Sequence, residues 1–182
     1  MMTVAREVTL VPSARAARLT PLPEDQHQQI MAVLARVKDP ELPMVSIEDL
    51  GILRGVGLSR SDSLEVRITP TYSGCPAVEA IRQDILAALN EAGFQNVSVV
   101  EQLHPAWTTD WMSEAGKRAL EEHGIAAPLP ATCAHPVPDH GLVCPLCKSK
   151  KTSLISEFGS TACKAMYKCT DCLEIFDYFK RF

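Results

Sequence analysis

Two Cys-x-x-Cys pairs near the C-terminus constrain the fold of this chain more than any other feature of its sequence. The pairs "CPLC" and "CTDC" are separated by 21 residues, close to the roughly fifteen to twenty that are usual between the two halves of a zinc site. A tetrahedral Zn²⁺ takes four thiolates at about 2.3 Å, and a two-residue gap lets one tight turn aim two sulfurs at one point. The spacing therefore predicts a single metal site with the ligands Cys144, Cys147, Cys169 and Cys172.

The segment that contains these cysteines, 142–182, is predicted to be a β zinc ribbon. About forty residues bury too little apolar surface to fold alone, whereas bound zinc contributes roughly 10–16 kcal/mol of apparent binding energy. Four cysteine ligands leave no open coordination position, so we expect the zinc to be structural. Unligated or disulfide-bonded cysteines, and a rubredoxin-like iron in place of zinc, are the alternatives. The strand candidates are "TSLISEF", "AMYKC" and "EIFDYFK".

Other potential ligands lie close to the ribbon in sequence. Cys163, in "FGSTACKA", is interpreted as a buried core cysteine, with a swapped ligand or a reactive thiol as the alternatives. Cys133, His135 and His140 precede the ribbon, and we interpret them as solvated groups rather than as extra ligands.

The composition indicates a globular protein with no role in nucleic-acid binding. Hydrophobic residues make up 46% of the chain and charged residues 22%, and the formal net charge is −4. Residues 142–182 carry a net charge of +3 against −7 for residues 1–141. Four thiolates around a divalent cation would reduce that positive charge to about +1, so the basic tail does not indicate nucleic acid as a partner.

No segment is predicted to cross or enter a membrane. There is no run of about eighteen apolar residues, and the N-terminus lacks the apolar stretch of a signal peptide. Seven cysteines in such a chain indicate the reducing cytoplasm, where they bind metal or take part in redox chemistry. Residues 1–23 are predicted to be a flexible arm, with a membrane or transit role as the less favoured alternative.

The apolar periodicity upstream predicts a small α+β domain over residues 24–124. The order helix, strand, strand, helix, strand, helix places helices on a short mixed sheet. The first two strands form an antiparallel hairpin, and the second and third are parallel through a right-handed crossover. Residues 125–141 contain four prolines and are predicted to be a linker. The predicted helices begin near Glu24, Pro76 and Thr109, and the strands span 52–59, 64–70 and 96–103.

One cysteine in the predicted α+β domain stands apart from the others. In "TYSGCPAVEA", Cys75 lies between a glycine and a proline that suits the first position of a helix. The positive end of the helix dipole is expected to lower the pKa of a thiol there, and Gly74 gives a ligand access. A thiolate in that place can bind iron or attack an electrophile. The alternative is a small buried residue at a helix start.

The sequence does not predict an enzyme. None of the five histidines has a position that makes it an evident base for Cys75. Asp39 and Glu41, in "DPELP", are brought near Cys75 by the fold or else form a turn with solvated acids. No phosphate-binding, flavin or nicotinamide fingerprint is present.

Four blocks of sequence together resemble a known family. "DPELPMVSIEDLGILRGV" with "ITPTYSGCPA" is similar to the SufT-type domain of iron–sulfur cluster assembly proteins. "HPAWTTDWMSEAGKRALEEHGIAAP" and the terminal "CPLCKSKKTSLISEFGSTACKAMYKCTDCLEIFDYFK" resemble the PaaD family, which belongs to the bacterial phenylacetyl-CoA epoxidase system. The resemblance covers residues 24–182.

The resemblance implies an accessory role. Members of this family accompany a multicomponent monooxygenase that epoxidises phenylacetyl-CoA in aerobic phenylacetate degradation, and PaaD is thought to assist cluster assembly in the iron–sulfur flavin reductase. By position, the resemblance implies a transient iron or cluster site at Cys75, Asp39, Glu41 and Thr71, and ribbon ligands at the four paired cysteines. No Glu-x-x-His pair is present for a di-iron centre, so the chain is not the oxygenase.

Three functions follow from these observations. The first is a non-catalytic maturation factor that binds iron or a cluster at Cys75, with a homodimer as one arrangement. It docks its client through the ribbon and an exposed aromatic end "FDYFKRF". The second is a scaffold component of the oxygenase complex. The third is a thiol enzyme with Cys75 as nucleophile, which the missing base disfavours.

Overall fold

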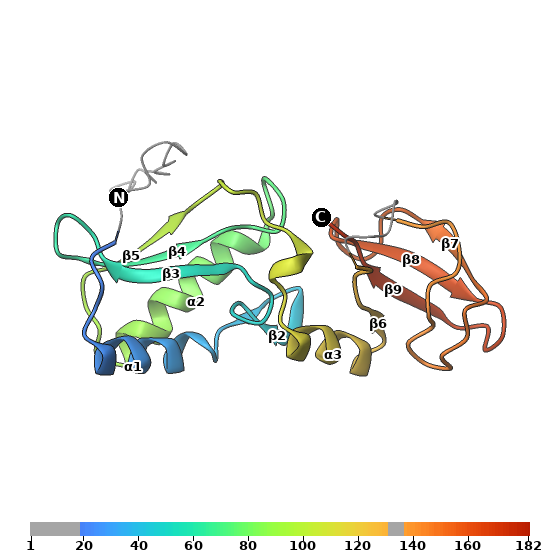
Figure 1. Cartoon of the computed structure of the whole chain (residues 1–182), viewed down its shortest axis with the longest axis horizontal. Helices are drawn as coiled ribbons and strands as arrows, with labels where there is room; N and C mark the ends of the chain where they lie inside the picture. The colour runs from blue at the N-terminus through green and yellow to red at the C-terminus, as the bar shows by residue number, and fades with distance from the viewer. Residues whose placement is uncertain (1–18, 131–136) are drawn as a thin grey trace, which may run out of the picture.

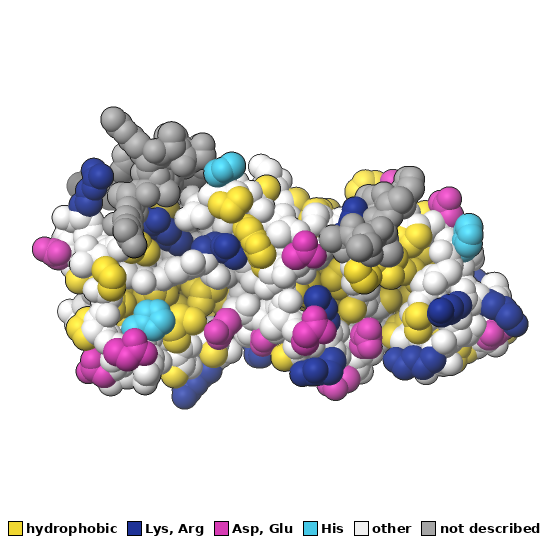
Figure 2. All heavy atoms as spheres, in the orientation of Figure 1, with side chains coloured by type: hydrophobic (Ala, Val, Ile, Leu, Met, Phe, Trp, Pro, Cys, Tyr) yellow, Lys and Arg dark blue, Asp and Glu magenta, His cyan; other side chains and the backbone are white. Residues whose placement is uncertain are grey.

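The computed structural model describes residues 19–130 and 137–182, which form two lobes along one long axis (Figure 1). We call residues 19–124 the N-terminal lobe and the described residues from 125 onward the ribbon lobe. Acidic and basic side chains are interspersed over the face shown in Figure 2. Within the described ranges, no helix has the length and apolar character needed to span a bilayer.

The N-terminal lobe is built on a mixed three-stranded sheet, as predicted. Strand β4 (Leu64–Ile68) pairs antiparallel with β3 (Leu53–Leu58) and parallel with β5 (Val97–Glu101). The two long helices, α1 (Glu24–Leu34) and α2 (Ala77–Glu91), contact one another, and α2 also contacts β5. The predicted hairpin and parallel crossover are therefore confirmed.

The core of this lobe follows directly from the sequence periodicity. The alternate side chains of β4 face inward as Leu64, Val66 and Ile68, and α2 presents a buried apolar stripe to the same core. Each fully buried aliphatic side chain contributes about 1.5–3 kcal/mol relative to exposure. The buried stripe of α2 consists of Ala77, Val78, Ile81, Ile85 and Leu89.

The two-stranded hairpin that follows α1 is not predicted by the sequence. Strands β1 (Lys38–Asp39) and β2 (Leu42–Ser46) pair antiparallel across the segment "DPELP". Both prolines remove a backbone donor, so the pattern of this segment indicates only the end of the helix. The hairpin accommodates Pro43 at an exposed position of a sheet that has only edge strands.

The last helix of this lobe begins later than predicted. A short 3-10 helix (η2, Thr109–Trp111) precedes α3 (Glu114–Glu122). Ser113 interrupts the two because it serves as the N-cap of α3: its hydroxyl accepts from the Gly116 N–H at 2.9 Å and donates to Asp49 at 2.6 Å.

The ribbon lobe contains the three predicted strands and one more. Strand β8 (Lys164–Cys169) pairs antiparallel with β7 (Thr152–Ser156) and β9 (Ile175–Phe179). Strand β6 (Ile125–Ala126) lies parallel to β9 and completes the sheet order β6-β9-β8-β7. The segment predicted as a linker therefore begins as part of the ribbon sheet.

Aromatic side chains join the two lobes. Trp107 contacts Phe179 and Phe182 at ring-centroid distances of 6.1 and 5.9 Å. The expectation that the aromatic end "FDYFKRF" is exposed is wrong. Phe176, Tyr178 and Phe179 are buried because they face the ribbon core and the N-terminal lobe.

Candidate metal and thiol sites

The four paired cysteines come together at one end of the ribbon lobe. Their sulfur atoms all lie within 4.8 Å of one another, with 3.8 Å between Cys144 and Cys172 and 3.5 Å between Cys147 and Cys169. A tetrahedral zinc with ligands at about 2.3 Å separates its sulfurs by about 3.8 Å. The donor set and its spacing therefore fit a zinc ion.

Two tight turns position these sulfurs. The backbone N–H of Lys148 donates to the Cys144 carbonyl at 2.9 Å, and that of Cys169 donates to Glu174 at 2.9 Å. Lys148 and Leu173 adopt positive φ angles of 62° and 66°, so the chain reverses immediately after each pair. Because all four ligands come from the protein, zinc here would hold the turns together and have no place for a substrate.

The extra ligands considered near the ribbon do not join this cluster. His140 is exposed and forms a backbone bridge with Ser153. Among the residues that the structure describes, only the four paired cysteines form a group of metal-ligating side chains this close together. Cys133 and His135 lie outside the described residues.

Cys75 lies where the sequence placed it, at the start of α2, and is half-buried. Its thiol is hydrogen-bonded to the Ala77 backbone N–H and to the Tyr72 side chain. Gly74 has a φ of +82°, and a Cβ added to it would meet no atom within 4 Å, so the approach to this loop is open.

The expectation that the helix dipole lowers the pKa of Cys75 is wrong in its net direction. Burial raises the pKa of this thiol above 9.0, and the nearby carboxylates of Glu41 and Asp39 raise it further. The hydrogen bonds from Ala77 and Tyr72 lower the pKa but do not outweigh burial. Cys75 is therefore mostly a protonated thiol at neutral pH.

The two acids of "DPELP" lie near Cys75 but differ in role. Asp39 is buried, and its Oδ1 accepts from the backbone N–H groups of Glu41 at 2.8 Å and Leu42 at 3.0 Å. Burial raises the pKa of Asp39 despite these bonds. Glu41 is partly exposed, and burial together with the Asp39 charge raises its pKa.

Thr71 is buried four residues before Cys75 on the same loop. The structure thus brings Asp39, Glu41 and Cys75 within electrostatic reach of one another, with Thr71 on the loop that carries the thiol. The assignment of these four residues to an iron or cluster site stays a prediction.

A fifth group at this place comes from the ribbon lobe. The Cys163 sulfur lies 4.0 Å from a Glu41 carboxylate oxygen and 3.0 Å from the Thr161 hydroxyl. Cys163 is buried, in agreement with its interpretation from the sequence, but in the core shared with the N-terminal lobe. Its position beside Glu41 depends on how two lobes pack, and no local pattern could have indicated it.

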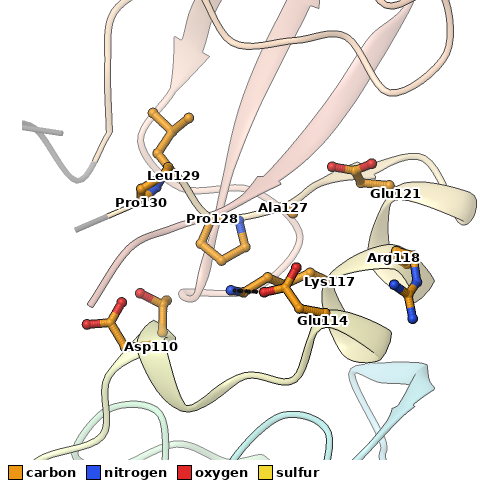
Figure 3. Close-up of a pocket in the computed structure, with 10 residues that line it drawn as sticks. Asp110, Glu114, Lys117, Arg118, Glu121, Ala127, Pro128, Leu129 and Pro130 are labelled. Carbon is orange, nitrogen blue, oxygen red and sulfur yellow. Dashed lines mark hydrogen bonds and ion pairs between the residues drawn. The ribbon is translucent and has the colours of Figure 1, made fainter. Parts of the chain in front are cut away.

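The largest groove in the described parts of the chain lies elsewhere. It has a volume of about 520 Å³ and runs between α3 and residues 127–130 (Figure 3). Its walls carry both charge signs, including the ion pair of Glu114 with Lys117 at 2.8 Å. None of the predicted site residues lines it.

Two family models match successive parts of the chain. Residues 27–100 match the iron–sulfur cluster assembly protein family, and residues 130–180 match the PaaD zinc β-ribbon domain. The first match spans the "DPELP" turn and Cys75, and the second spans all four paired cysteines.

Similar proteins repeat this division. Two chains named as Fe–S protein maturation auxiliary factors match about half of this chain. One, from Bacillus subtilis, is 35% identical and covers 51% of this chain and 91% of itself; the other, from Porphyromonas gingivalis, is 32% identical, with 48% and 83%. A chain from Escherichia coli, named as the D component of 1,2-phenylacetyl-CoA epoxidase, is 48% identical over 164 residues, which are 90% of this chain and 98% of that protein. The chain therefore belongs to the PaaD family of phenylacetyl-CoA epoxidase components.

Proposed function

We propose that this protein is a non-catalytic accessory factor of a phenylacetyl-CoA epoxidase system, in which it assists the assembly or delivery of an iron–sulfur cluster. The likeness to the epoxidase component from Escherichia coli supports the first part of this proposal, and the likeness to maturation factors supports the second. The proposed client is the iron–sulfur flavin reductase of that system. Iron or the cluster is then cargo, whereas the zinc of the ribbon is a resident structural ion.

The observation that most supports this proposal is the setting of Cys75. Its thiol lies at a helix start, half-buried and next to two carboxylates, on a loop with open space at Gly74. A thiol kept protonated in this way is a poor nucleophile. Binding of a thiophilic cation displaces that proton, so the setting suits metal capture better than covalent catalysis.

The proposal divides the chain by role. Residues 24–124 would hold the cargo, and residues 142–182 would hold zinc and set the position of the ribbon. Residues 125–141 would connect the two, and residues 1–23 would form an arm without a direct part in the chemistry.

The test is the cluster content of the reductase in cells. Cys75→Ala should leave the reductase largely without its cluster, and the purified variant should load less iron in anaerobic reconstitution with iron and sulfide. Ser73→Ala is the matched control, because it also removes one heavy atom from an exposed position two residues away. If Cys75→Ala cells produce a reductase with its full cluster, the delivery role is wrong.

A scaffold role is the second candidate, because the ribbon lobe presents several large apolar side chains to solvent. Loss of the ribbon ligands would then abolish stoichiometric co-purification with the oxygenase components, while Cys75→Ala would retain it. The exposed apolar residues are Leu146, Ile155, Phe158, Leu173 and Ile175.

A further inference from the structure

We infer that Cys163 of the ribbon lobe is the second thiol ligand of the cation that binds at Cys75, with Glu41 as the carboxylate ligand between them. The ligand would be a thiophilic divalent cation of the Fe²⁺ class. This inference rests on the proposed function, since it completes the ligand set of the site that would receive iron. It also gives the ribbon a direct part in that site.

The contacts around Glu41 place the two thiols on one small surface. The Cys163 sulfur lies 4.0 Å from Glu41 Oε2, a distance suited to two ligands of one ion. The Tyr72 side chain is hydrogen-bonded to Cys75 and lies within electrostatic reach of both Cys163 and Glu41. Tyr72 therefore lies beside both thiols, although they are 88 positions apart in sequence.

The surroundings of Cys163 are unlike those of an ordinary core cysteine. A core cysteine packs as a small hydrophobic group, whereas Cys163 is 3% exposed yet meets a carboxylate and a hydroxyl. No ion pair of Asp39 or Glu41 is found among the described residues. The nearby ammonium of Lys164 pairs instead with Asp177 at 3.7 Å.

A divalent cation would answer this arrangement. Buried carboxylates without a paired cation are costly, and soft thiolates select iron, zinc or copper(I) over harder cations. Open space around Gly74 allows the Cys75 loop to adjust as the ligands close on the ion. Two thiols and one carboxylate leave a coordination position open, which suits cargo that must leave again, in contrast to the closed four-cysteine site.

The ribbon zinc would then position Cys163. This residue immediately precedes β8, and the other end of β8 is the zinc ligand Cys169. In addition, the Lys180 backbone N–H donates to the Cys163 carbonyl at 2.9 Å, which ties the residue to the end of β9. A ribbon that is folded around zinc thus presents the second thiol at a fixed place.

The experiment is an anaerobic titration of Co²⁺ into the zinc-loaded full-length protein, followed by thiolate-to-cobalt charge-transfer absorption. Wild type should bind one further Co²⁺ with the intensity of two thiolates. Cys163→Ser and Cys75→Ser should each lose about half of that intensity and bind at least about tenfold more weakly. Glu41→Gln should keep the intensity and weaken binding, whereas Glu48→Gln, an exposed neighbour, should change neither.

Zinc content and near-ultraviolet circular dichroism establish that each variant is folded, and Cys163→Ala serves as a second variant should Cys163→Ser be unstable. If both Cys163 variants bind Co²⁺ as wild type does, the inference is wrong, and the proposed function remains if Cys75→Ser has lost binding. If wild type binds no additional Co²⁺, the inference is also wrong. The proposed function is then judged separately, by the cluster content of the reductase in cells.

Discussion

The ring of Phe182 stacks on the ring of Tyr72, with centroids 6.4 Å apart and an interplanar angle of 16°. The stack links the end of the ribbon lobe to the loop that carries Cys75. Because Tyr72 is also hydrogen-bonded to the Cys75 side chain, the thiol is connected to the ribbon lobe through a single aromatic residue. Zinc, the ribbon and the thiol site are therefore expected to respond together.

Loss of zinc should expose Trp107. In a Trp111→Phe background, Cys169→Ser should lose the bound zinc and shift the Trp107 emission to longer wavelength, because Phe179 and Phe182 no longer cover the indole. The helical circular dichroism should persist, since α1 and α2 belong to a separate core. An unshifted emission in a zinc-free variant would show that the lobes stay packed without the metal.

Gly51→Ala should strongly destabilise the protein. Gly51 has φ of +74°, and a Cβ there would lie 2.6 Å from the Trp111 carbonyl oxygen. Backbone strain and overpacking together should lower the free energy of unfolding by about 2–5 kcal/mol in chemical denaturation. Gly55→Ala is the matched control, because its Cβ meets nothing within 4 Å. Equal stability of the two variants would contradict this account.

Asp39→Ala and Asp39→Asn should have opposite effects at neutral pH. Alanine leaves the Glu41 and Leu42 N–H groups without their acceptor, at a cost of roughly 1–3 kcal/mol. Asparagine keeps an acceptor and removes a buried charge. Asp39→Asn should therefore be at least as stable as wild type.

The pH dependence of stability tests the same residue. Burial raises the pKa of Asp39 above 3.8, so its protonation contributes stability that is complete below pH 3.8 and is lost as the pH rises through the folded-state pKa. Unfolding free energies measured against pH should show the advantage of Asp39→Asn at neutral pH disappearing in acid. An advantage that persists below pH 3.8 would rule out the charge as its cause.

Cys75 should react slowly with iodoacetamide at neutral pH and faster as the pH rises beyond 9.0, because its pKa is raised. Glu41→Gln removes a negative charge that raises this pKa, so the thiolate fraction and the alkylation rate at neutral pH should both increase. Peptide mapping by mass spectrometry isolates the rate at Cys75 from the other thiols. Glu48→Gln should leave the rate unchanged, and a slower reaction in Glu41→Gln would contradict the electrostatic explanation.

The features that the sequence predicts correctly are those with local causes. The paired cysteines indicate their own geometry through a two-residue gap, and the apolar periods of 64–68 and 77–91 are sufficient to predict β4 and α2. The parallel pairing of β4 with β5 follows from the helix between them. In each case the interaction that decides the structure lies within a few residues or one crossover.

What the sequence does not predict depends on contacts between distant segments. The net direction of the Cys75 pKa shift follows from burial and from carboxylates more than thirty positions away. Cys163 reaches Glu41 only because the two lobes pack together. The β1–β2 hairpin forms because the Asp39 side chain accepts from backbone N–H groups in a segment where two prolines limit backbone pairing, an arrangement that propensity alone does not show.

The carbonyl oxygen of Phe182 accepts from the Thr108 hydroxyl at 3.1 Å and from the Thr109 N–H at 3.4 Å. Any polypeptide appended after this residue would emerge beside Trp107 and Tyr72. An affinity tag or fluorescent fusion at that end would thus press on the lobe boundary. Recombinant preparations meant for metal analysis are better tagged ahead of the first residue.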